Sequence, residues 1–432
     1  MKKVRIGDFL HRVKETIIIQ DTEEYKRVTI KSKNQGIYLR NSALGKDIGT
    51  KKQFIISKGQ FLLSKIDARF GAFGIVPENL DKAIITGNFW AYEVDKNVID
   101  IELFNIFVSS KNFIEICSQA SSGTTHRKYL DEKKFLNFEI DFPPLEEQKT
   151  IIKSYKKKND CNILIQSEIQ TQQELLKKLR QSILQEAIEG KLTKEWREKN
   201  PDVEQASVLL EKIKQEKEQL IKEKKIKKQK PLPPISEDEV PFEIPDSWVW
   251  CRLGDVITNI KGGGTPSKHN PAYWNGNIPW ASVKDLKGNE LFKTKDYITE
   301  NGLNNSSSNL IEKDNLIIST RMGLGKILFN KINIAINQDL KALFIDFINK
   351  KHFFYTYKTY SILGRGTTVD GIRQEVLLGY LYPLPPLQEQ KEIVKKIENL
   401  FAICDKLEIE IQSSKKSSEQ LIQAVLKEAF EK

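Results

Sequence analysis

The chain has 432 residues, of which 39% are hydrophobic and 29% charged, so it is too long for one ordinary core and too hydrophobic to be disordered. Lysine and arginine outnumber aspartate and glutamate by 69 to 58, and the resulting net charge of +11 favours a polyanionic partner. Four scattered cysteines argue against a disulfide framework or a Cys-x-x-Cys metal site. Because there is neither an apolar leader nor an apolar run of about 18 residues, we expect a cytoplasmic protein without a membrane span.

The first predicted element is a globular domain over residues 1–147. It ends at the proline turn FPPLEEQKTI, Phe142–Ile151. Proline stops a strand and suits the first turn of a helix, where early glutamates complement the helix dipole. We therefore assign this turn a structural function, as the end of a strand and the start of a long helix.

Residues 148–247 are predicted to hold spacer helices and a linker. The first helix carries an apolar seam with polar interruptions, at Ile151, Tyr155, Lys158, Asn162, Ile165, Ile169, Gln172, Leu176, Leu179 and Ile183. A second helical stretch is broken at Asn200-Pro201 and ends in a lysine run, Lys222–Lys230, which we interpret as a solvated face. The proline-spaced segment Pro231–Pro245 is predicted to be an extended linker.

A second globular domain is predicted over residues 248–388, and its motifs do not indicate catalysis. Gly262-Gly263-Gly264 precedes Thr-Pro and not Gly-Lys-Ser/Thr, so we interpret it as a flexible turn and not as a phosphate-binding loop. Asn270-Pro271-Ala272-Tyr273 superficially resembles the Asn-Pro-Pro-Tyr signature of adenine methyltransferases. It lacks the second proline, and no glycine-rich cofactor turn precedes it.

Isolated polar residues give no metal or nuclease site either. The four histidines, His11, His126, His269 and His352, have no companions at ligand spacing. Asp67 and Asp339 fit surface or capping roles better than a nuclease pair. Trp274 and Trp280 are expected to fill the domain core and not to stack on bases.

The last element, residues 389–432, repeats the first long helix. LPPLQEQKEI, Leu384–Ile393, matches the earlier proline turn at an offset of 242 residues (384 minus 142). The seam recurs at Ile393, Ile397, Leu400, Cys404, Leu407, Ile411, Ser414, Ser418, Leu421 and Val425. Gly123-Thr124-Thr125 and Gly366-Thr367-Thr368 also correspond, and because both domains carry them we interpret them as a shared turn.

The repeat predicts an α/β fold: two mixed α/β domains separated by a pair of long antiparallel coiled-coil helices, with a pseudo-twofold internal repeat. Each helix runs for about 40 residues, roughly 60 Å, which is longer than a small domain can cover. Packing the two helices together buries both seams. The alternative is that each helix packs only on its own domain.

Three features resemble a known family: the stretch Gly262–Leu286 (GGGTPSKHNPAYWNGNIPWASVKDL), the twin PPLxEQ turns, and Ala187–Pro201 (AIEGKLTKEWREKNP). Together they are similar to the specificity subunit of type I restriction-modification systems over essentially the whole chain, although the first domain lacks the Gly-Gly-Thr-Pro opening. The resemblance implies two target recognition domains, each reading half of a bipartite, asymmetric site on double-stranded DNA. The paired helices would be a ruler between them.

The resemblance also implies partners. In that family, methyltransferase subunits carrying S-adenosylmethionine and restriction subunits using ATP dock on the scaffold. This chain is therefore expected to hold no cofactor or metal and to be non-catalytic within an adenine-N6 DNA methyltransferase and nuclease complex for phage defence, with S-adenosylmethionine, ATP and Mg²⁺ on the partners. We expect DNA contacts from basic and small polar residues in loops. The candidates are Arg40, Lys65, Arg69, His126, Arg127 and Lys128 in the first domain, and Lys261, Thr265, Ser267, Lys268, Lys284, Arg321, Lys326, Arg365 and Arg373 in the second.

Two other classes of function stay open at this point. One is a self-contained methyltransferase or nuclease, which requires a cofactor or metal motif. The other is a helical scaffold that binds only protein. A DNA reader is distinguished from both by affinity that falls steeply as salt rises. The bases recognised and the spacer length cannot be predicted from the sequence.

Overall fold

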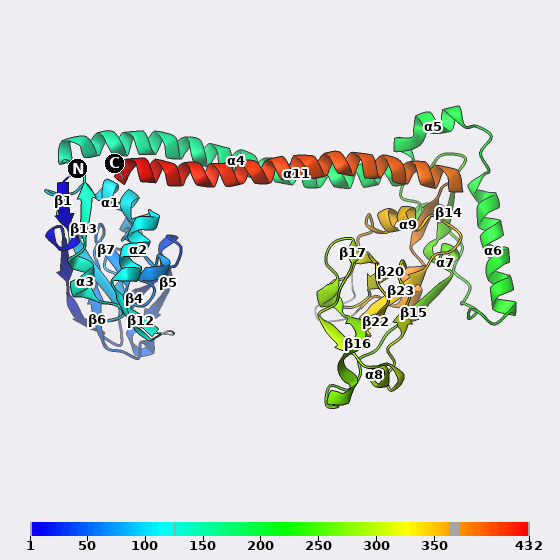
Figure 1. Ribbon diagram of the computed structural model, residues 1–432, viewed down its shortest axis with the longest axis horizontal. Coiled ribbons are helices and arrows are strands. Elements are labelled where there is room, and N and C mark those ends of the chain that lie inside the picture. Colours follow the sequence, from blue (N-terminus) through cyan, green and yellow to red (C-terminus); the bar gives the residue numbers. More distant parts are fainter. Residues whose placement is uncertain (1, 125–126, 363–370, 431–432) are drawn as a thin grey trace. The chain divides into compact units, whose positions relative to one another are not determined.

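A computed structural model describes residues 2–124, 127–362 and 371–430 (Figure 1). The chain divides into two compact units: unit 1 contains residues 1–172 and 411–432, and unit 2 contains residues 173–410. Each unit holds one globular domain and part of both long helices. Within the described ranges, no helix combines the length and the apolar character that crossing a membrane requires.

Two larger sheets form most of the domain of unit 1, beside two two-stranded sheets. The four-stranded sheet has the order β2-β10-β7-β8, with strands β2 (Leu10–Val13), β10 (Phe89–Val94), β7 (Phe61–Ser64) and β8 (Phe73–Ile75). The five-stranded sheet has the order β3-β6-β9-β4-β5, with strands β3 (Thr16–Ile18), β6 (Lys52–Ile55), β9 (Ile84–Ile85), β4 (Glu24–Lys31) and β5 (Gly36–Leu44). All pairings are antiparallel except β4 with β9.

The domain of unit 2 repeats this plan. Its first sheet has the order β15-β23-β20-β21-β17, with strands β15 (Asn259–Gly262), β23 (Leu340–Phe344), β20 (Leu316–Ser319), β21 (Ile327–Asn330) and β17 (Glu290–Leu291). Its second has the order β19-β22-β16-β18, with strands β19 (Leu310–Ile311), β22 (Ile334–Ile336), β16 (Trp274–Ala281) and β18 (Asp296–Ile298). The parallel pair β16/β22 corresponds to β4/β9. The two domains thus share strand order and direction, with β3 and β17 as local additions, which confirms the internal repeat.

Shorter helices complete each unit, and most of them contribute buried residues. Unit 1 has α1 (Ile101–Val108), α2 (Lys111–Gln119) and α3 (Glu132–Leu136), with the hairpin β11 (Ser121–Thr124) and β12 (Arg127–Leu130). Unit 2 has α5 (Lys194–Lys199), α6 (Ala206–Lys222), α7 (Leu253–Val256), α8 (Glu300–Asn304), α9 (Lys350–Tyr357) and α10 (Gln374–Leu378). Single 3-10 turns lie at η1 (Ile6–Asp8), η2 (Gly45–Asp47), η3 (Ala68–Phe70), η4 (Glu78–Leu80), η5 (Lys191–Thr193), η6 (Glu237–Glu239), η7 (Pro271–Tyr273) and η8 (Val283–Asp285).

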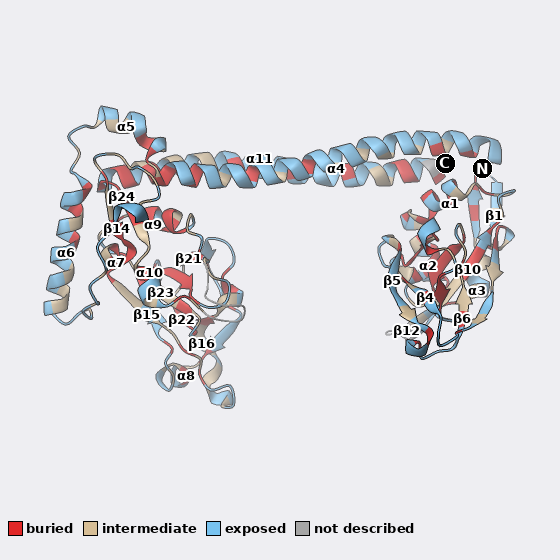
Figure 2. Cartoon of the chain, turned by 180° about the vertical axis from the view of Figure 1, so that it is seen from behind, coloured by how far each residue is buried: buried red, intermediate tan, exposed pale blue. Residues whose placement is uncertain are grey.

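Aromatic rings dominate the core of unit 1. Phe61 meets Phe104 and Phe113 edge to face, with ring centroids 5.0 and 5.9 Å apart, an arrangement that aromatic quadrupoles favour. Figure 2 shows that the buried residues concentrate in the sheets and their covering helices. Many loop residues at the strand ends are exposed, and these are free to carry binding side chains.

The proline turns fix each long helix to its own domain. Strand β13 (Glu139–Phe142) pairs with β1 (Lys2–Arg5) before the first turn, and β24 (Leu381–Leu384) pairs with β14 (Val249–Arg252) before the second. The buried Gln148 side chain donates to Pro143 O (2.9 Å) and accepts from Asp100 N (2.7 Å). Gln390 likewise donates to Pro385 O (2.8 Å) and accepts from Asn349 N (2.8 Å).

These contacts confirm the structural function of the turns, and the glutamine side chain of each turn makes them. Asp100 and Asn349 are the N-caps of α1 and α9, so each glutamine joins a helix start in the domain to the start of the long helix. Glu389, next to Gln390, is fully buried and accepts from Thr193, Arg197 and Trp248. Its counterpart Glu147 is exposed.

The long helices are α4 (Leu145–Ile188) and α11 (Leu387–Phe430), and they pair in antiparallel fashion within each unit. In unit 1, Gln166 donates to Ser418 Oγ (2.8 Å), which in turn donates to Asn162 Oδ1 (2.5 Å). In unit 2, Arg180 binds Asp405 (2.5 Å) and Glu408 (3.2 Å). A buried polar layer such as that at Ser418 favours one register of a helix pair.

The predicted apolar seam of the long helices is confirmed only in part. Most of its positions seven residues apart, among them Ile169, Leu176, Cys404 and Ile411, are buried. Most of the alternate positions are exposed, including Ile165, Leu179, Leu407 and Leu421, whereas Ile393 near the start of the second helix is buried. The neighbouring Gln166, Arg180, Phe401 and Ile422 are partly covered instead. Residues three or four positions apart lie on nearly the same face of a helix. The apolar pattern alone therefore does not show which of two adjacent positions is the buried one.

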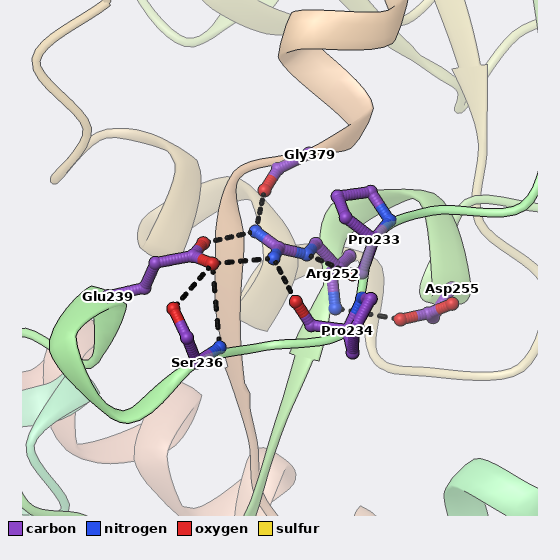
Figure 3. A network of polar contacts seen from close by, with 7 residues as sticks. All are labelled: Pro233, Pro234, Ser236, Glu239, Arg252, Asp255 and Gly379. Carbon is purple, nitrogen blue, oxygen red and sulfur yellow. Dashed lines mark hydrogen bonds and ion pairs between the residues drawn. The ribbon is translucent and has the colours of Figure 1, made fainter.

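An arginine holds the proline-spaced linker against unit 2 (Figure 3). Arg252 pairs both terminal nitrogens with Glu239, at 2.7 and 3.1 Å, and donates to Pro233 O, Pro234 O and Gly379 O. The Arg252 guanidinium and the Ser236 hydroxyl lower the pKa of Glu239 to about 2. The segment therefore has little regular structure, yet specific contacts fix it to the domain. Helix α6 also joins that domain, because Leu209 and Ile213 are buried in its core.

Candidate nucleic-acid interface

A groove of about 860 Å³ lies in unit 2, between the glycine-rich loop, β16 and the ends of β20 and β22. Four predicted site residues line it: Thr265, Lys268, Lys284 and Lys326. The three lysines are exposed, and no ion-pair partner is found for them among the described residues. Asp296 and Asp339 also contribute to the wall. The groove thus offers separated cations among polar and aromatic side chains, an arrangement suited to phosphates and base edges.

The glycine-rich loop is packed tightly, which corrects its interpretation as a flexible turn. A side chain at Gly263 would place its Cβ 2.0 Å from Ile336 O, and one at Gly264 would place it 2.0 Å from Ser307 Oγ. Gly264 N donates to Ile336 O (3.0 Å). Glycine is therefore needed for close approach of the backbone to β22, and this approach fixes Thr265 at the rim of the groove.

Two tryptophans support the groove floor. Trp280 is buried and donates from Nε1 to Gly264 O (3.1 Å) and Ser308 Oγ (3.3 Å), which confirms its expected role in the core. Trp274 packs against it edge to face at 5.2 Å, but it is only partly buried. Its Nε1 donates to Ser267 O (3.1 Å) and thereby orders the segment that carries Ser267 and Lys268.

The Asn270–Tyr273 motif forms a capped turn. The Asn270 side-chain oxygen accepts from Ala272 N (3.1 Å) and caps η7. In this position the Asn270 oxygen already accepts a hydrogen bond from the backbone. The similarity to a methyltransferase signature is thus accounted for by local structure.

Other predicted residues of unit 2 lie around the groove or away from it. Arg321 follows β20 and lies 3.6 Å from Asp339. Lys261 on β15 extends its Nζ over the Phe344 ring at 5.2 Å. Arg373 is exposed at the N-cap of α10. Arg365 and the second Gly-Thr-Thr segment lie outside the described residues.

In unit 1 the structure brings Lys65, Arg69 and Lys128 to the region around η3 and the β11–β12 hairpin. The Lys65 carbonyl accepts from Leu130 N (2.8 Å), and its Nζ lies 5.8 Å from the Tyr129 ring centroid. Lys128 lies on β12, in the strand pair with β11.

The remaining candidates of unit 1 are separate from this cluster or incompletely described. Arg40 is exposed at an irregularity of the edge strand β5. The backbone of Arg127 belongs to β12, whereas His126 lies outside the described residues.

The sequence did not indicate two exposed apolar residues next to predicted arginines, Phe70 beside Arg69 and Met322 beside Arg321. Apolar side chains between strands resemble core residues in a sequence, so no signal separated them. Asn337 and Gln338 were also missed, although both line the groove. Within the described residues, no group of three or more histidine, cysteine, aspartate or glutamate side chains could hold a metal ion.

Comparisons with known proteins agree with this architecture. The EcoEI specificity subunit, from a type I restriction enzyme of Escherichia coli, is 28% identical over 394 residues that cover 76% of this chain and 64% of that subunit. This chain therefore matches less than two-thirds of the length of EcoEI. The MjaVIII specificity subunit of Methanocaldococcus jannaschii is 25% identical, with 97% of this chain and 91% of that subunit covered.

Solved structures show the same fold. A chain from work on complex assembly and conformational transition of the type I R-M system has a TM-score of 0.67 at 17% identity and covers 99% of this chain, with 97% of its own length matched. The HsdS subunit of Thermoanaerobacter tengcongensis has a TM-score of 0.52 at 18% identity, with coverage of 99% and 96%. The model of the type I restriction modification DNA specificity domain matches residues 1–175 and 245–414, which are most of the sequence. The chain therefore belongs to the type I restriction-modification DNA specificity family.

Proposed function

We propose that this chain is the DNA-recognition subunit of a type I restriction-modification complex. Each globular domain would read one half of a bipartite, asymmetric site on double-stranded DNA. The proposal rests on one observation: both domains have the same strand order, but their loops carry different basic residues. The Lys268–Lys284–Lys326 groove serves the second domain, and the Lys65–Arg69–Lys128 cluster serves the first.

The chemistry of these surfaces supports DNA as the ligand. Lysines without ion-pair partners gain from phosphate contacts by releasing counterions, and the groove also presents hydroxyl and amide groups that can reach base edges. Because the loops differ in sequence between the domains, the two half-sites should differ.

The long helices offer a surface for protein partners. Leu164 on α4 is 71% exposed and Ile409 on α11 is 69% exposed, and other apolar residues on both helices are also open to solvent. Exposed apolar side chains that lie together, such as Leu175 and Leu179 one turn apart on α4, are typical of interaction sites. We assign this surface to methyltransferase subunits, with restriction subunits joining the assembly. S-adenosylmethionine, ATP and Mg²⁺ would be bound by those partners, and this chain alone would catalyse neither methylation nor cleavage.

Mapping methylated adenines across the genome, with and without this gene, tests the proposal. The expected result is one two-part motif that disappears on deletion and returns on complementation. The purified chain alone should be silent in a methylation assay. An unchanged methylation pattern, or robust methylation by the chain without partners, would contradict the proposal.

A further inference from the structure

The two domains carry a matching loop between equivalent strands. In unit 1 it joins β7 to β8, and in unit 2 it joins β20 to β21. Ser64 is paired with Phe89 on β10, and Ser319 is paired with Leu340 on β23, so the two serines hold the same place in the sheets. Both serines are buried, and both loops begin directly after them.

Each of these loops presents an arginine followed by an exposed apolar side chain. The pair is Arg69-Phe70 in unit 1 and Arg321-Met322 in unit 2, and the apolar residues are 51% and 53% exposed. A single exposed apolar residue is ordinary. The same dipeptide chemistry recurs in the equivalent loop of two diverged domains, although Arg69 lies five residues after Ser64 and Arg321 lies two residues after Ser319. This recurrence points to a shared kind of partner.

The loop of unit 1 holds Phe70 outward by backbone contacts. Lys33 N donates to Phe70 O (2.7 Å), and Asn34 N donates to Gly71 O (3.0 Å). Gly71 has φ +80°, and a Cβ there would lie 2.5 Å from Asn34 Oδ1, so the turn requires glycine. The ring is therefore presented by a fixed turn, which lowers the entropy cost of binding.

The Arg69 side chain is also held in an orientation that suits ligand binding. Its guanidinium lies 4.5 Å from the centroid of the Phe70 ring, and its buried Nε has no hydrogen-bond partner among the described atoms. Stacking orients the flat guanidinium and leaves its outer N–H groups available for acceptors.

In unit 2 the corresponding pair borders the cationic groove. Met322 lines it together with Lys326, and the Met322 carbonyl accepts from Ser319 Oγ. Arg321 is held loosely by Asp339, at 3.6 Å. The exposed apolar side chain thus stands among groups that suit DNA.

We propose that Phe70 and Met322 each contact the C5 methyl group of a thymine in the major groove, while Arg69 and Arg321 donate to acceptors on an adjacent base pair or phosphate. The inference rests on the proposed function. The thymine methyl is the apolar feature that the base edges present in the major groove, and apolar side chains recognise it directly. Phe70 and Met322 would then be specificity-determining residues that differ between the half-sites.

Replacing thymine by deoxyuridine tests this contact, because this change removes the methyl group and nothing else. The full chain, with its methyltransferase subunits, is titrated with duplexes that carry the motif found by methylation mapping. We expect deoxyuridine in one half-site to weaken binding about fourfold, which corresponds to about 0.8 kcal/mol for one buried methyl group. Phe70→Ala should bind the thymine and deoxyuridine forms of its half-site equally, and Met322→Ala should do so for the other half-site.

Matched controls separate this contact from general effects. Ile18→Ala in unit 1 and Phe292→Ala in unit 2 remove side chains that are 57% and 65% exposed, and both should keep the wild-type discrimination. Phe70→Leu preserves an apolar side chain and should retain part of it, even if the alanine variant folds poorly.

Three results would overturn the inference while leaving the proposed function intact: a wild-type complex indifferent to deoxyuridine at every position, alanine variants that still discriminate, or a half-site without a thymine on either strand. If the wild-type complex does not prefer its motif to a scrambled duplex, the proposed function itself fails.

Discussion

Arg252 and Glu239 form a two-point ion pair that holds the linker on the second domain, with nitrogen–oxygen distances of 2.7 and 3.1 Å. The arginine side chain is 7% exposed, and the glutamate side chain is 40% exposed. Arg252 thus holds a segment with little regular structure, both through Glu239 and through the carbonyls of Pro233 and Pro234.

Replacing Glu239 by glutamine should loosen the part of this segment around Glu239, while the hydrogen bonds from Arg252 to Pro233 O and Pro234 O remain. Phe242, which packs against Trp250 at 5.1 Å, would become accessible, so limited chymotrypsin digestion should cut after Phe242 several times faster than in the wild type. Glu237→Gln removes the same charge from the same turn without touching Arg252 and serves as the control. Because the pKa of Glu239 is lowered to about 2, the wild-type ion pair should be present above the usual pKa of glutamate and should be lost as the pH falls toward 2. Chymotrypsin is inactive in acid, so hydrogen exchange of this segment measures that loss. Equal digestion of both variants would argue against the ion pair as the clamp.

Removing the buried glutamine of the second proline turn should destabilise unit 2. Gln390→Leu leaves Asn349 N without its acceptor and Pro385 O without its donor, and each unsatisfied buried group costs about 1–3 kcal/mol. Thermal melting and hydrogen exchange at the start of α9 would report the destabilisation. The exposed neighbour Gln388 gives the control, since Gln388→Leu should change neither measurement. A wild-type melting profile for Gln390→Leu would show that the turn does not depend on this residue.

The groove lysines should account for part of the salt dependence of DNA binding. We expect Lys268→Gln, Lys284→Gln and Lys326→Gln together to weaken binding to all duplexes and to reduce the slope of log affinity against log salt by about 0.9 for each phosphate that a lysine no longer neutralises. Electrophoretic mobility shift at several salt concentrations measures this slope. A triple glutamine variant of Lys227, Lys228 and Lys230 removes as much charge from the exposed run after α6 and should leave the slope unchanged. If the slope falls in the run variant instead, the binding surface is elsewhere.

His352 should make the second domain sensitive to acid. Burial lowers the pKa of this histidine to about 3, and its Nδ1 lies 2.7 Å from the Tyr382 hydroxyl. The unfolded chain takes up a proton near pH 6.5 that the folded chain does not, so stability present at pH 7 is lost as the pH falls below about 6.5. The expected decrease between pH 7 and pH 5 is about 2 kcal/mol.

Urea unfolding of the wild type and of His352→Gln, at both pH values, measures this decrease. The variant should be less stable at pH 7 and should show a smaller change at pH 5. His269→Gln, at an exposed position, should behave like the wild type. Identical pH dependence in all three proteins would count against His352 as the cause.

The sequence predicted the architecture well because a duplication is visible without any geometry. The proline turns, the helix lengths and the repeat all follow from spacing, and spacing survives folding. The edge of the helix seam did not follow, since Leu407 and Ile165 are as apolar as the residues that are buried. Their exposure depends on which face the partner helix covers.

The candidate site was predictable only in part. Lys268, Lys284 and Lys326 were found because basic residues in polar loops stand out, and the fold then gathered them at one groove. Phe70 and Met322 were missed, since exposure is decided by tertiary packing that has no local signature. Gly263 was misread for a related reason: a tight approach to Ile336 in a distant strand cannot be seen in three consecutive glycines.

The glutamine contacts at Gln148 and Gln390 have a mechanical consequence. The start of each long helix is hydrogen-bonded to its own domain, so the helix cannot rotate freely about that junction. Inserting a single residue into α4 would turn everything beyond it by about 100° and advance it by about 1.5 Å. Seven residues nearly restore the angle, to within about 20°. Insertions or deletions in α4 are therefore tolerated only in near-whole numbers of turns. The length of this helix can change during evolution in steps and not continuously.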